Sequence, residues 1–235
     1  IMRPNRPDVL LAMGSYASVG PVCAALSLGI PVVLHEANVL PGRTISLFSR
    51  WATAVAGSFE ETRFYLRRKD IVVTGMPIRK ELEKAARTIP PHETGRDIFT
   101  LLVMGGSRGA HRLNDLVSAA VIQIHKGGHR IRVIHLTGVA DEATIRKAYQ
   151  DAGVNAVVSA FEQDMAPIYA AADIAICRSG ASTCAELLDF AVPALQVPYP
   201  EATKDHQMVN ARAMEKAGAV DVVPERDLSL PWLTD

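Results

Sequence analysis

A glycine-rich segment near the middle of the chain has the composition of an anion-binding loop. Met104–Ala110 reads MGGSRGA, with three glycines, and lies between a strongly apolar run and a long helical pattern. Glycines let the backbone approach a ligand closely, and the first N–H groups of the following helix are available to an anion. Ser107 adds a hydroxyl donor. We therefore expect a phosphate site here; the alternative is that the glycines only permit a tight turn.

A second segment combines hydroxyl side chains with one carboxylate. Cys177–Thr183 reads CRSGAST, follows another apolar run and opens another helix, with Ser179, Ser182 and Thr183 as suitable N-cap residues. Glu186 follows in an apolar part of that helix. Its carboxylate either favours the positive end of the helix dipole or accepts two hydroxyls of a ribose or sugar. A phosphate loop and a diol loop together indicate a nucleotide sugar.

Two other kinds of site are disfavoured by spacing. A dinucleotide fingerprint needs G-x-G-x-x-G and an acidic residue about 20 positions later, but the glycine spacing differs and no Asp or Glu lies between Asp115 and Asp141. A zinc-protease helix needs a second histidine after His35 and Glu36, and it is absent. Because the seven His and three Cys show no other ligand spacing, we expect no metal and no cofactor.

One catalytic motif stays open as an alternative. The first loop also matches G-x-S-x-G, the nucleophile elbow of α/β hydrolases, with Ser107 as the nucleophile. Asp173 and His206 follow in the order that such a triad requires. A Ser107-type hydrolase is therefore an alternative function, although the motif is short and occurs often by chance.

Short apolar runs alternate with helical patterns along the chain. The runs are continuous rather than alternating, which is typical of strands buried on both faces of a parallel sheet. Strand–helix repetition then predicts Rossmann-like, doubly wound α/β architecture, whose ligands bind beyond the carboxyl ends of the strands. The predicted strands are 8–13, 31–35, 53–56, 70–74, 98–104, 131–136, 155–159, 173–177, 194–197 and 219–222. The clearest predicted helices are 112–125, 141–152 and 204–216, each closed by a glycine within two residues.

The pattern is interrupted once. Residues 86–97 read ARTIPPHETGRD, where two prolines and a glycine prevent a regular element. This predicts two α/β units, 1–85 and 97–235, with a linker at 86–96; the alternative is a surface loop inside one sheet. The first unit has few strands for this class and the chain begins with Ile1, so we expect further sequence before it.

Composition narrows the class of protein. The chain has 235 residues, 49% hydrophobic, with 25 Lys+Arg against 25 Asp+Glu. This hydrophobic fraction is ample for a core, and the balanced charge gives no basic footprint for a nucleic acid. No apolar run approaches the roughly 18 residues of a membrane span. Three cysteines, Cys23, Cys177 and Cys184, without a CxxC pair are typical of reduced, buried thiols in a cytoplasmic protein.

Six segments in unbroken order resemble the MurG family of UDP-N-acetylglucosamine–N-acetylmuramyl-(pentapeptide) pyrophosphoryl-undecaprenol N-acetylglucosamine transferases. They are AMGSYAS, IPVVLHEAN, TGMPIR, VMGGSRGA, CRSGASTCAE and KDHQ…NA. The resemblance implies the two-domain GT-B fold, with 1–85 as the C-terminal part of the acceptor and membrane-side domain and 97–235 as an incomplete UDP-GlcNAc-binding domain. It also implies inverting transfer of GlcNAc from UDP-GlcNAc to the 4-hydroxyl of MurNAc-pentapeptide on undecaprenyl-pyrophosphate lipid I. The product would be lipid II of peptidoglycan synthesis, the cell-wall pathway needed for cell shape and division. A related UDP-sugar enzyme, such as a UDP-GlcNAc epimerase, is the alternative.

The resemblance also implies which residues bind the donor. Asn38, from the first unit, and Arg79, from the first unit and the hinge, would help to close the cleft, and Ser107 would meet the pyrophosphate. Glu162 would lie at the uracil, and Gln207 would bind the GlcNAc hydroxyls. The α-phosphate and ribose segment would consist of Ala181, Ser182, Thr183, Cys184, Ala185 and Glu186, with Glu186 on the ribose.

This chain departs from the family pattern in several places. The first glycine-rich loop, GGTGGH-like, is absent, so its general-base histidine is absent and the catalytic base here is unknown. Gly14-Ser15-Tyr16 stands where the family often has Gly-Gly-Tyr. The C-terminal helices are also missing, so we expect a catalytically incomplete fragment or a nucleotide-sugar binding module. Because the family's acceptor is a lipid, we expect peripheral attachment to the cytoplasmic face of the bacterial membrane, with the aromatic and basic run Phe64–Lys69 as a candidate contact.

Overall fold

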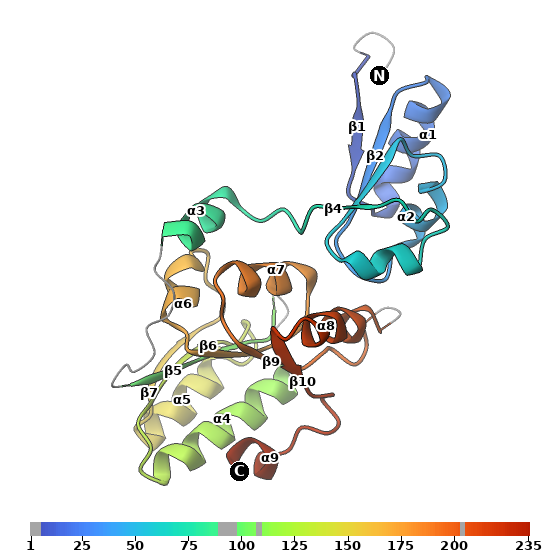
Figure 1. Ribbon diagram of the computed structural model, residues 1–235. Helices are drawn as coiled ribbons and strands as arrows, with labels where there is room; N and C mark the ends of the chain where they lie inside the picture. Colours follow the sequence, from blue (N-terminus) through green and yellow to red (C-terminus); the bar gives the residue numbers. More distant parts are fainter. Residues whose placement is uncertain (1–5, 89–97, 107–109, 203–204) are drawn as a thin grey trace. The chain divides into compact units, whose positions relative to one another are not determined.

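The computed structural model describes residues 6–88, 98–106, 110–202 and 205–235 (Figure 1). The chain divides into two compact units, residues 1–77 and 78–235. Each unit contains one parallel sheet, of four and of six strands. Every one of the ten predicted runs contains a strand, and the predicted fold class is confirmed.

Unit 1 is a parallel sheet in sequence order. Its strands pair as β1-β2-β3-β4. Buried apolar residues of β2 and β3 pack with the helices into one hydrophobic cluster. The bounds are β1 Leu10–Ala12, η1 Tyr16–Ser18, α1 Val19–Ser27, β2 Val32–Glu36, α2 Arg43–Phe48, β3 Ala54–Gly57, η2 Glu60–Phe64 and β4 Val72–Val73.

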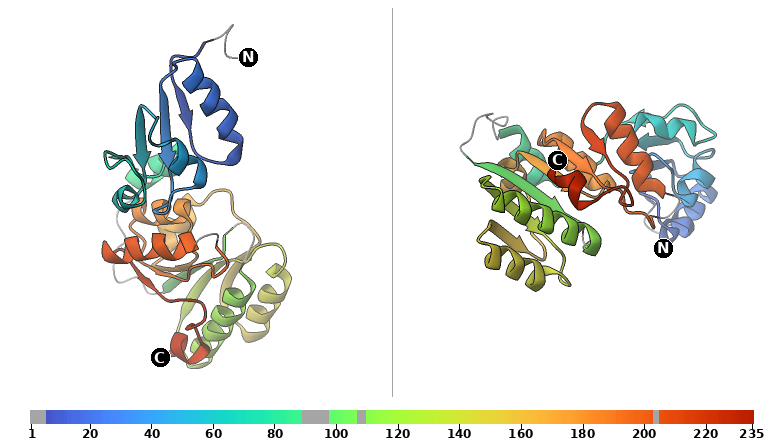
Figure 2. Two further views of the ribbon diagram at one scale, coloured as in Figure 1. Left: turned by 90° about the vertical axis from the view of Figure 1, so that its right-hand side faces the viewer. Right: turned by 90° about the horizontal axis from the view of Figure 1, so that it is seen from below.

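Unit 2 is a six-stranded parallel sheet in the order β10-β9-β8-β5-β6-β7. Helices α4 and α5 cover one face, and α6, α7 and α8 cover the other (Figures 1 and 2). The strands are β5 Phe99–Met104, β6 Ile131–Leu136, β7 Asn155–Ser159, β8 Ile174–Cys177, β9 Ala194–Gln196 and β10 Val220–Val222. The helices are α3 Lys80–Thr88, α4 His111–Lys126, α5 Glu142–Ala152, α6 Ala166–Ala171, α7 Ala181–Asp189, α8 His206–Lys216 and α9 Leu230–Thr234.

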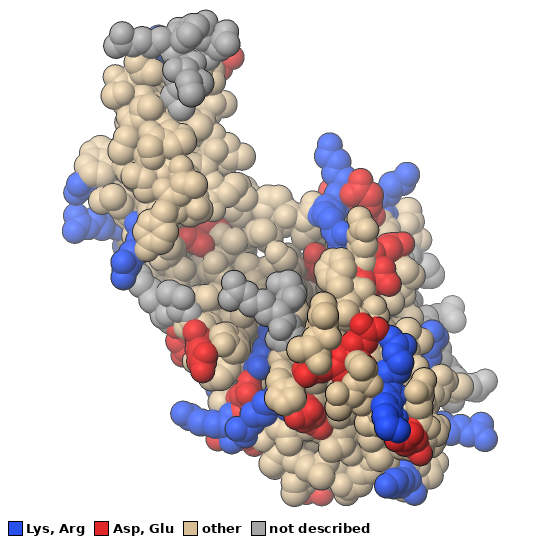
Figure 3. All heavy atoms as spheres, turned by 180° about the vertical axis from the view of Figure 1, so that it is seen from behind, with Lys and Arg blue, Asp and Glu red and all other residues tan. Residues whose placement is uncertain are grey.

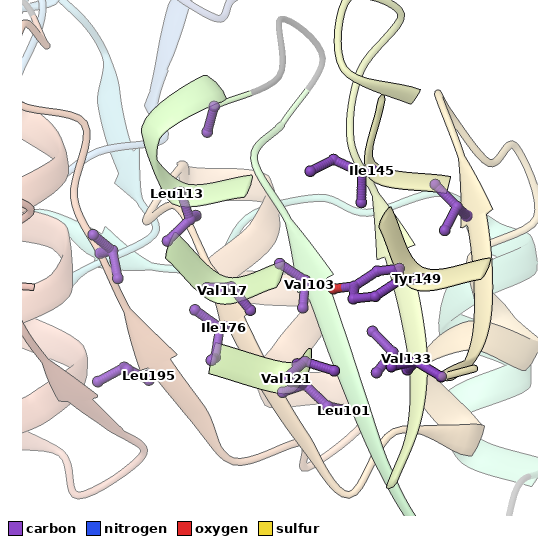
Figure 4. Packing of buried hydrophobic residues seen from close by; sticks show 14 of the residues in the cluster. Leu101, Val103, Leu113, Val117, Val121, Val133, Ile145, Tyr149, Ile176 and Leu195 are labelled. Carbon is purple, nitrogen blue, oxygen red and sulfur yellow. The ribbon is translucent and has the colours of Figure 1, made fainter. Parts of the chain in front are cut away.

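The central strand of unit 2 explains why its sequence is apolar without alternation. Five of the six residues of β5 are buried, because helices lie on both faces of the sheet. Leu101 and Val103 point toward α4 and α5, where they pack against Val117 and Tyr149 (Figure 4). The register pairs Met104, the last residue of β5, with Cys177, the last residue of β8.

That pairing fixes the place where a ligand can bind. The strand order reverses between β5 and β8, so the connections that follow these strands run in opposite directions and leave a crevice at the carboxyl edge. The backbone N–H of Arg178 donates to the carbonyl of Met104 at 3.4 Å. The two chemically distinctive loops of the sequence therefore begin side by side.

The boundary between the units differs from the prediction. The first unit ends at Pro77 rather than at residue 85, and α3 belongs to unit 2. Leu82 of α3 is buried, and this helix packs against α6 and α7. Residues 86–88 of the predicted linker are the last turn of α3, and the remainder, from residue 89, lies outside the described residues.

Surface charge follows the balanced composition. On the face drawn in Figure 3, basic and acidic side chains are interspersed over the larger unit. No helix of the described residues is long and apolar enough to span a bilayer.

Candidate functional site

The loop between β8 and α7 presents the open end of a helix. The N-cap of α7 is Gly180, with φ −65° and ψ 149°. The expectation that Ser179, Ser182 or Thr183 caps this helix is therefore wrong. Because glycine has no capping side chain, the N-cap leaves the first N–H groups of α7 directed at the carboxyl edge of the sheet, where they favour an anion.

Ser179 fixes this loop instead of capping it. Its hydroxyl donates to the carbonyl of Gln207 at 2.8 Å, and the side-chain amide of Asn210 donates to the carbonyl of Ser179 at 3.3 Å. Ser179 and Asn210 are both fully buried. The start of α7 is thus tied to the first turns of α8, which sets the distance between the two helix ends.

Arg178 ties three strand ends together. Its guanidinium donates to the carbonyls of Val197 and Pro198 at 3.0 and 3.2 Å, beyond the end of β9. It also pairs with the carboxylate of Glu225 at 2.5 Å, just after β10. Both charged side chains are about nine-tenths buried. This role is not evident from the sequence, and a guanidinium with all these partners is structural rather than free for a ligand.

Glu186 extends from the second turn of α7 and is only partly buried. The hydroxyl of Tyr169, in α6, donates to Oε2 of Glu186 at 2.7 Å. Burial, followed by the adjacent carboxylate, raises the pKa of Tyr169 far above its ordinary value. The phenol therefore keeps its proton and acts as a neutral donor. Tyr169 was not among the predicted residues; its signal in the sequence is a polar aromatic residue in the short helical stretch APIYAA.

The loop between β7 and α6 brings two predicted residues together. Oε1 of Glu162 accepts from the backbone N–H groups of Gln163 and Asp164 at 2.8 and 3.0 Å. The guanidinium of Arg79 donates to the carbonyl of Gln163 at 2.8 Å. Arg79 was expected in the first unit and the hinge, but it lies in unit 2, directly before α3. Arg79 thus stabilises the loop between β7 and α6, whose conformation the Glu162 carboxylate also stabilises.

Gln207 lies at the start of α8, beside the same edge. Its side-chain oxygen accepts from the backbone N–H of Tyr199 at 2.9 Å, which joins α8 to the segment after β9. Asp205 occupies the N-cap with φ 56° and makes no side-chain capping bond. Since the side-chain oxygen of Gln207 is already bonded, its amide nitrogen is the atom suited to bind a sugar hydroxyl.

The segment from 181 to 186 is not uniform. Ser182 is exposed, and Ala181, Thr183 and Ala185 are partly exposed. Cys184 is buried, and its sulfur accepts from the side-chain amide of Gln196 at 3.4 Å. Burial raises the pKa of Cys184 to about 11. Its thiol faces the core, and its backbone N–H donates to the carbonyl of Gly180 at 2.9 Å, so the role of Cys184 in donor binding stays a prediction. Of the three cysteines expected to be buried, Cys177 and Cys184 are buried and Cys23 is exposed.

The first turn of α4 is anchored by a buried polar network. The side-chain nitrogen of Asn114 donates to the carbonyl of Thr137 at 2.9 Å and to the carboxylate of Asp141 at 2.7 Å. Its oxygen lies 3.1 Å from Nε2 of His135, whose Nδ1 lies 3.0 Å from the hydroxyl of Tyr149. Because Asn114 presents its oxygen, His135 donates through Nε2 and accepts at Nδ1. Ser107, in the loop before α4, lies outside the described residues.

In unit 1 the residues after β2 form a closed loop. The Glu36 carboxylate accepts from the backbone and the side chain of Asn38, at 3.0 and 3.4 Å, and from the backbone of Gly42 at 2.8 Å. Asn38 is partly buried within this loop. The structure does not place unit 1 relative to unit 2, so Asn38 remains a predicted site residue.

The hydrolase alternative fails on geometry. The triad needs a carboxylate near Ser107 at the carboxyl edge, but Asp173 precedes β8. Its side chain accepts from the backbone N–H of Thr100, near the start of β5, at 2.6 Å. Asp173 therefore lies at the opposite edge of the sheet from the loop after Met104. Among the described residues there is also no cluster of His, Cys, Asp and Glu that could hold a metal ion.

Comparison with known proteins agrees with this geometry. Residues 100–235 match the model of the glycosyltransferase family 28 C-terminal domain, and residues 1–57 match that of the N-terminal domain. The chain is similar to the UDP-N-acetylglucosamine–N-acetylmuramyl-(pentapeptide) pyrophosphoryl-undecaprenol N-acetylglucosamine transferases of Geobacter sulfurreducens and Syntrophotalea carbinolica, with 38% and 42% identity. Each match covers 97% of this chain, which spans 63% of the length of these relatives.

Two solved structures extend the comparison. The MurG structure from Acinetobacter baumannii superposes with a TM-score of 0.81 at 30% identity, covering 99% of this chain and 65% of that one. A UDP-GlcNAc 2-epimerase from Neisseria meningitidis, bound to UDP-GlcNAc, superposes with a TM-score of 0.60 at 17% identity, covering 95% of this chain and 66% of that one. The second similarity establishes a common fold and no more.

Proposed function

Because this chain belongs to glycosyltransferase family 28, we propose that it is part of an enzyme that transfers GlcNAc from UDP-GlcNAc to lipid I, with unit 1 in the acceptor domain and unit 2 as the donor-binding domain. The acceptor would be the 4-hydroxyl of the MurNAc-pentapeptide unit, and the products would be lipid II and UDP. The observation that carries the proposal is the meeting of the β5 and β8 loops at the switch point, with an open helix end and a partly exposed carboxylate beside it.

The proposed donor site follows from the chemistry of each group. The N-terminus of α7 and the loop containing Ser107 suit the pyrophosphate. Glu186 suits the two ribose hydroxyls, the Glu162 loop suits the uracil through its backbone, and Gln207 suits the GlcNAc hydroxyls. Arg79 supports the uracil loop through the carbonyl of Gln163. Asn38 would approach the donor from unit 1.

The proposed reaction is a direct displacement at the anomeric carbon. The acceptor oxygen forms a bond to that carbon as the bond to the UDP oxygen breaks, and the configuration inverts. Negative charge develops on the departing pyrophosphate, where helix N-termini and hydroxyl donors stabilise it. The acceptor hydroxyl gives up its proton in the same step, to solvent or to a base that we assign to no residue of this chain.

Donor binding is the first test. Replacing Glu186 by Ala removes the acceptor for both ribose hydroxyls, and we expect the UDP-GlcNAc dissociation constant from isothermal titration to rise at least about tenfold. Asp189→Ala, on the same helix, is the matched control. An unchanged constant in the Glu186 variant contradicts its ribose role, and a wild-type chain that binds no UDP-GlcNAc contradicts the donor site.

Acceptor-dependent chemistry separates transfer from epimerisation. We expect the complete gene product to release UDP from UDP-GlcNAc only when lipid I is present. Conversion of UDP-GlcNAc without an acceptor would favour an epimerase instead. A protein that binds UDP-GlcNAc but releases no UDP in the presence of lipid I would contradict the transfer reaction while leaving the donor site intact.

We also propose peripheral attachment to an anionic membrane surface on the cytoplasmic side. In the run Phe64–Lys69, both aromatic residues and Arg67 are exposed. Arg68 is bound to Asp70 at 2.7 Å, and Lys69 donates to a backbone carbonyl at 3.0 Å, so Arg67 is the cation best suited to a lipid headgroup. Flotation with phosphatidylglycerol vesicles should fall in Arg67→Ala and stay unchanged in Arg132→Ala; equal flotation of both would contradict this contact.

A further inference from the structure

We propose that Tyr169 is a positioning residue that orients Glu186 for the ribose and thereby sets the preference of the site for ribonucleotides over 2′-deoxyribonucleotides. This inference rests on the proposed role of Glu186 in donor binding. In this proposal Tyr169 does not contact the nucleotide itself and acts through the carboxylate of Glu186.

Tyr169 is held rigidly beneath the switch point. Its side chain is 1% exposed, and its ring packs against Phe190 with centroids 5.2 Å apart. The hydroxyl reaches Oε2 of Glu186 at 2.7 Å and lies 4.0 Å from the sulfur of Met104. One side chain of α6 therefore touches the last residue of β5 and the carboxylate of α7, the two elements that frame the crevice.

The chemistry of this contact is that of an orienting bond. A glutamate side chain has several rotatable bonds, and fixing it costs conformational entropy. A carboxylate offers about four lone-pair positions, and the phenol occupies one of them. The other positions, on Oε1 above all, remain for the two hydroxyls of a ribose. With Glu186 already fixed, a nucleotide does not have to order it on binding.

The kind of donor also matters. The phenol is neutral and buried, so it fixes the carboxylate without adding a positive charge next to it. A lysine or arginine in its place would neutralise the group that is to receive the ribose hydroxyls. Tyrosine orients the Glu186 carboxylate, which keeps its negative charge and can still accept hydrogen bonds from a ligand.

Nucleotide discrimination follows from this arrangement. A site built to bind a substrate hydroxyl rejects an analogue that lacks it, because a polar group of the protein is left unpaired. That rejection is strong only when the group cannot turn away to another partner. Tyr169 holds Glu186 in place, so the penalty for a missing 2′-hydroxyl should depend on Tyr169.

The test compares UDP with 2′-deoxy-UDP by isothermal titration. We expect the wild-type chain to bind UDP more tightly. In Tyr169→Phe, which removes one hydroxyl and keeps the ring, we expect UDP affinity to fall about tenfold, 2′-deoxy-UDP affinity to change little, and the ratio to approach one. In a Glu186→Ala background, Tyr169→Phe should cause no further loss, because the residue acts through Glu186.

Tyr149→Phe is the matched control. Tyr149 is equally buried and hydrogen-bonded, but to His135, so its loss should leave the UDP to 2′-deoxy-UDP ratio unchanged. If Tyr169→Phe weakens the binding of both nucleotides equally, or leaves the ratio of their affinities unchanged, the positioning role of Tyr169 is overturned while the donor site still stands. A wild-type chain that binds both nucleotides equally overturns the ribose role of Glu186, and the inference with it.

Discussion

Two glutamates, one in each unit, lie near the carboxyl edge of a parallel sheet, yet their surroundings differ: Glu36 ends β2, and Glu186 lies in the second turn of α7. Glu36 in unit 1 is 5% exposed and accepts two backbone N–H bonds, from Asn38 and Gly42, that close its own loop. Glu186 in unit 2 is partly exposed and, among the described residues, accepts one side-chain bond, from the phenol of Tyr169.

The difference separates a structural carboxylate from one suited to a ligand. Glu36 is occupied by backbone donors from the same chain, and its removal would leave those N–H groups unsatisfied. Glu186 is oriented by one neutral donor and keeps acceptor capacity at the edge. The same distinction applies to the cations: Arg178 is bound to two carbonyls and a carboxylate, whereas Arg67 is exposed.

The largest effect is expected for Arg178→Met. Removing the guanidinium leaves the buried Glu225 with only the longer ion pair to Arg112, at 3.9 Å, and we expect the free energy of unfolding of unit 2 to fall by about 3 kcal/mol. Urea denaturation measures this with Trp232, in α9, as the fluorescence reporter in a Trp51→Phe background. Adding Glu225→Gln should recover part of the loss. A fall in the free energy of unfolding of less than about 1 kcal/mol would contradict the structural role of Arg178.

Acid should destabilise unit 2 through His135. Burial lowers the pKa of His135 to about 4 from an ordinary 6.5, so below pH 6.5 the unfolded chain binds a proton that the folded chain excludes. The free energy of unfolding should fall by about 3 kcal/mol from above pH 6.5 down to pH 4.

The exposed His111 acts in the opposite sense. The hydrogen bond with Asp141 raises its pKa, so its stabilisation is present at low pH and is lost as the pH rises. Comparing wild type with His135→Asn isolates the His135 contribution, and His129→Asn, exposed in the same unit, serves as the control. Parallel pH profiles for wild type and His135→Asn would contradict this assignment.

The central comparison is tested by a matched pair, Glu36→Gln and Glu186→Gln. In the first, an amide replaces a carboxylate that binds two backbone donors, and we expect unit 1 to lose about 2 kcal/mol. In the second, we expect less than about 0.5 kcal/mol from unit 2, because the group is partly exposed and has one donor. Trp51 and Trp232 report the two units separately. Equal losses would remove the distinction between the two carboxylates.

The smallest effect concerns the backbone of unit 1. Ser15 has φ 73° and ψ 151°, a region populated almost only by glycine. Ser15→Gly should raise the stability of unit 1 by about 1 kcal/mol, offset slightly by the loss of the side-chain bond to the N–H of Ala17. A thermal melt followed through Trp51 measures it. A lower melting temperature would show that the serine side chain outweighs the strain.

The fold was largely predictable because a strand buried on both faces of a sheet has a continuous apolar sequence. The continuous apolar run of β5 predicts a central strand, and the structure confirms it. Family membership was also predictable, because the six motifs are short, ordered and rich in glycine and polar residues. Glu186 and Gln207 lie at the predicted edge for the same reason, and their contacts with a donor stay a prediction.

The contacts that the sequence does not predict are those between distant elements. Nothing near Arg178 in the sequence indicates that Glu225 and two carbonyls surround it. The direction of the Cys184 thiol depends on which face of α7 packs inward, and the position of α3 depends on α6 and α7. Tyr169 was missed because its partner Glu186 is 17 residues away. Such pairings exist only in three dimensions.

The assignment of α3 to unit 2 has a mechanical consequence. The polypeptide leaves unit 1 at Pro77, and the carbonyl of Gly75 is fastened to the ring of His35 at 3.0 Å. The backbone that joins the two units is thereby reduced to Met76, Pro77 and Ile78, and the proline ring fixes one of its torsion angles. The connecting segment therefore contains few rotatable backbone bonds.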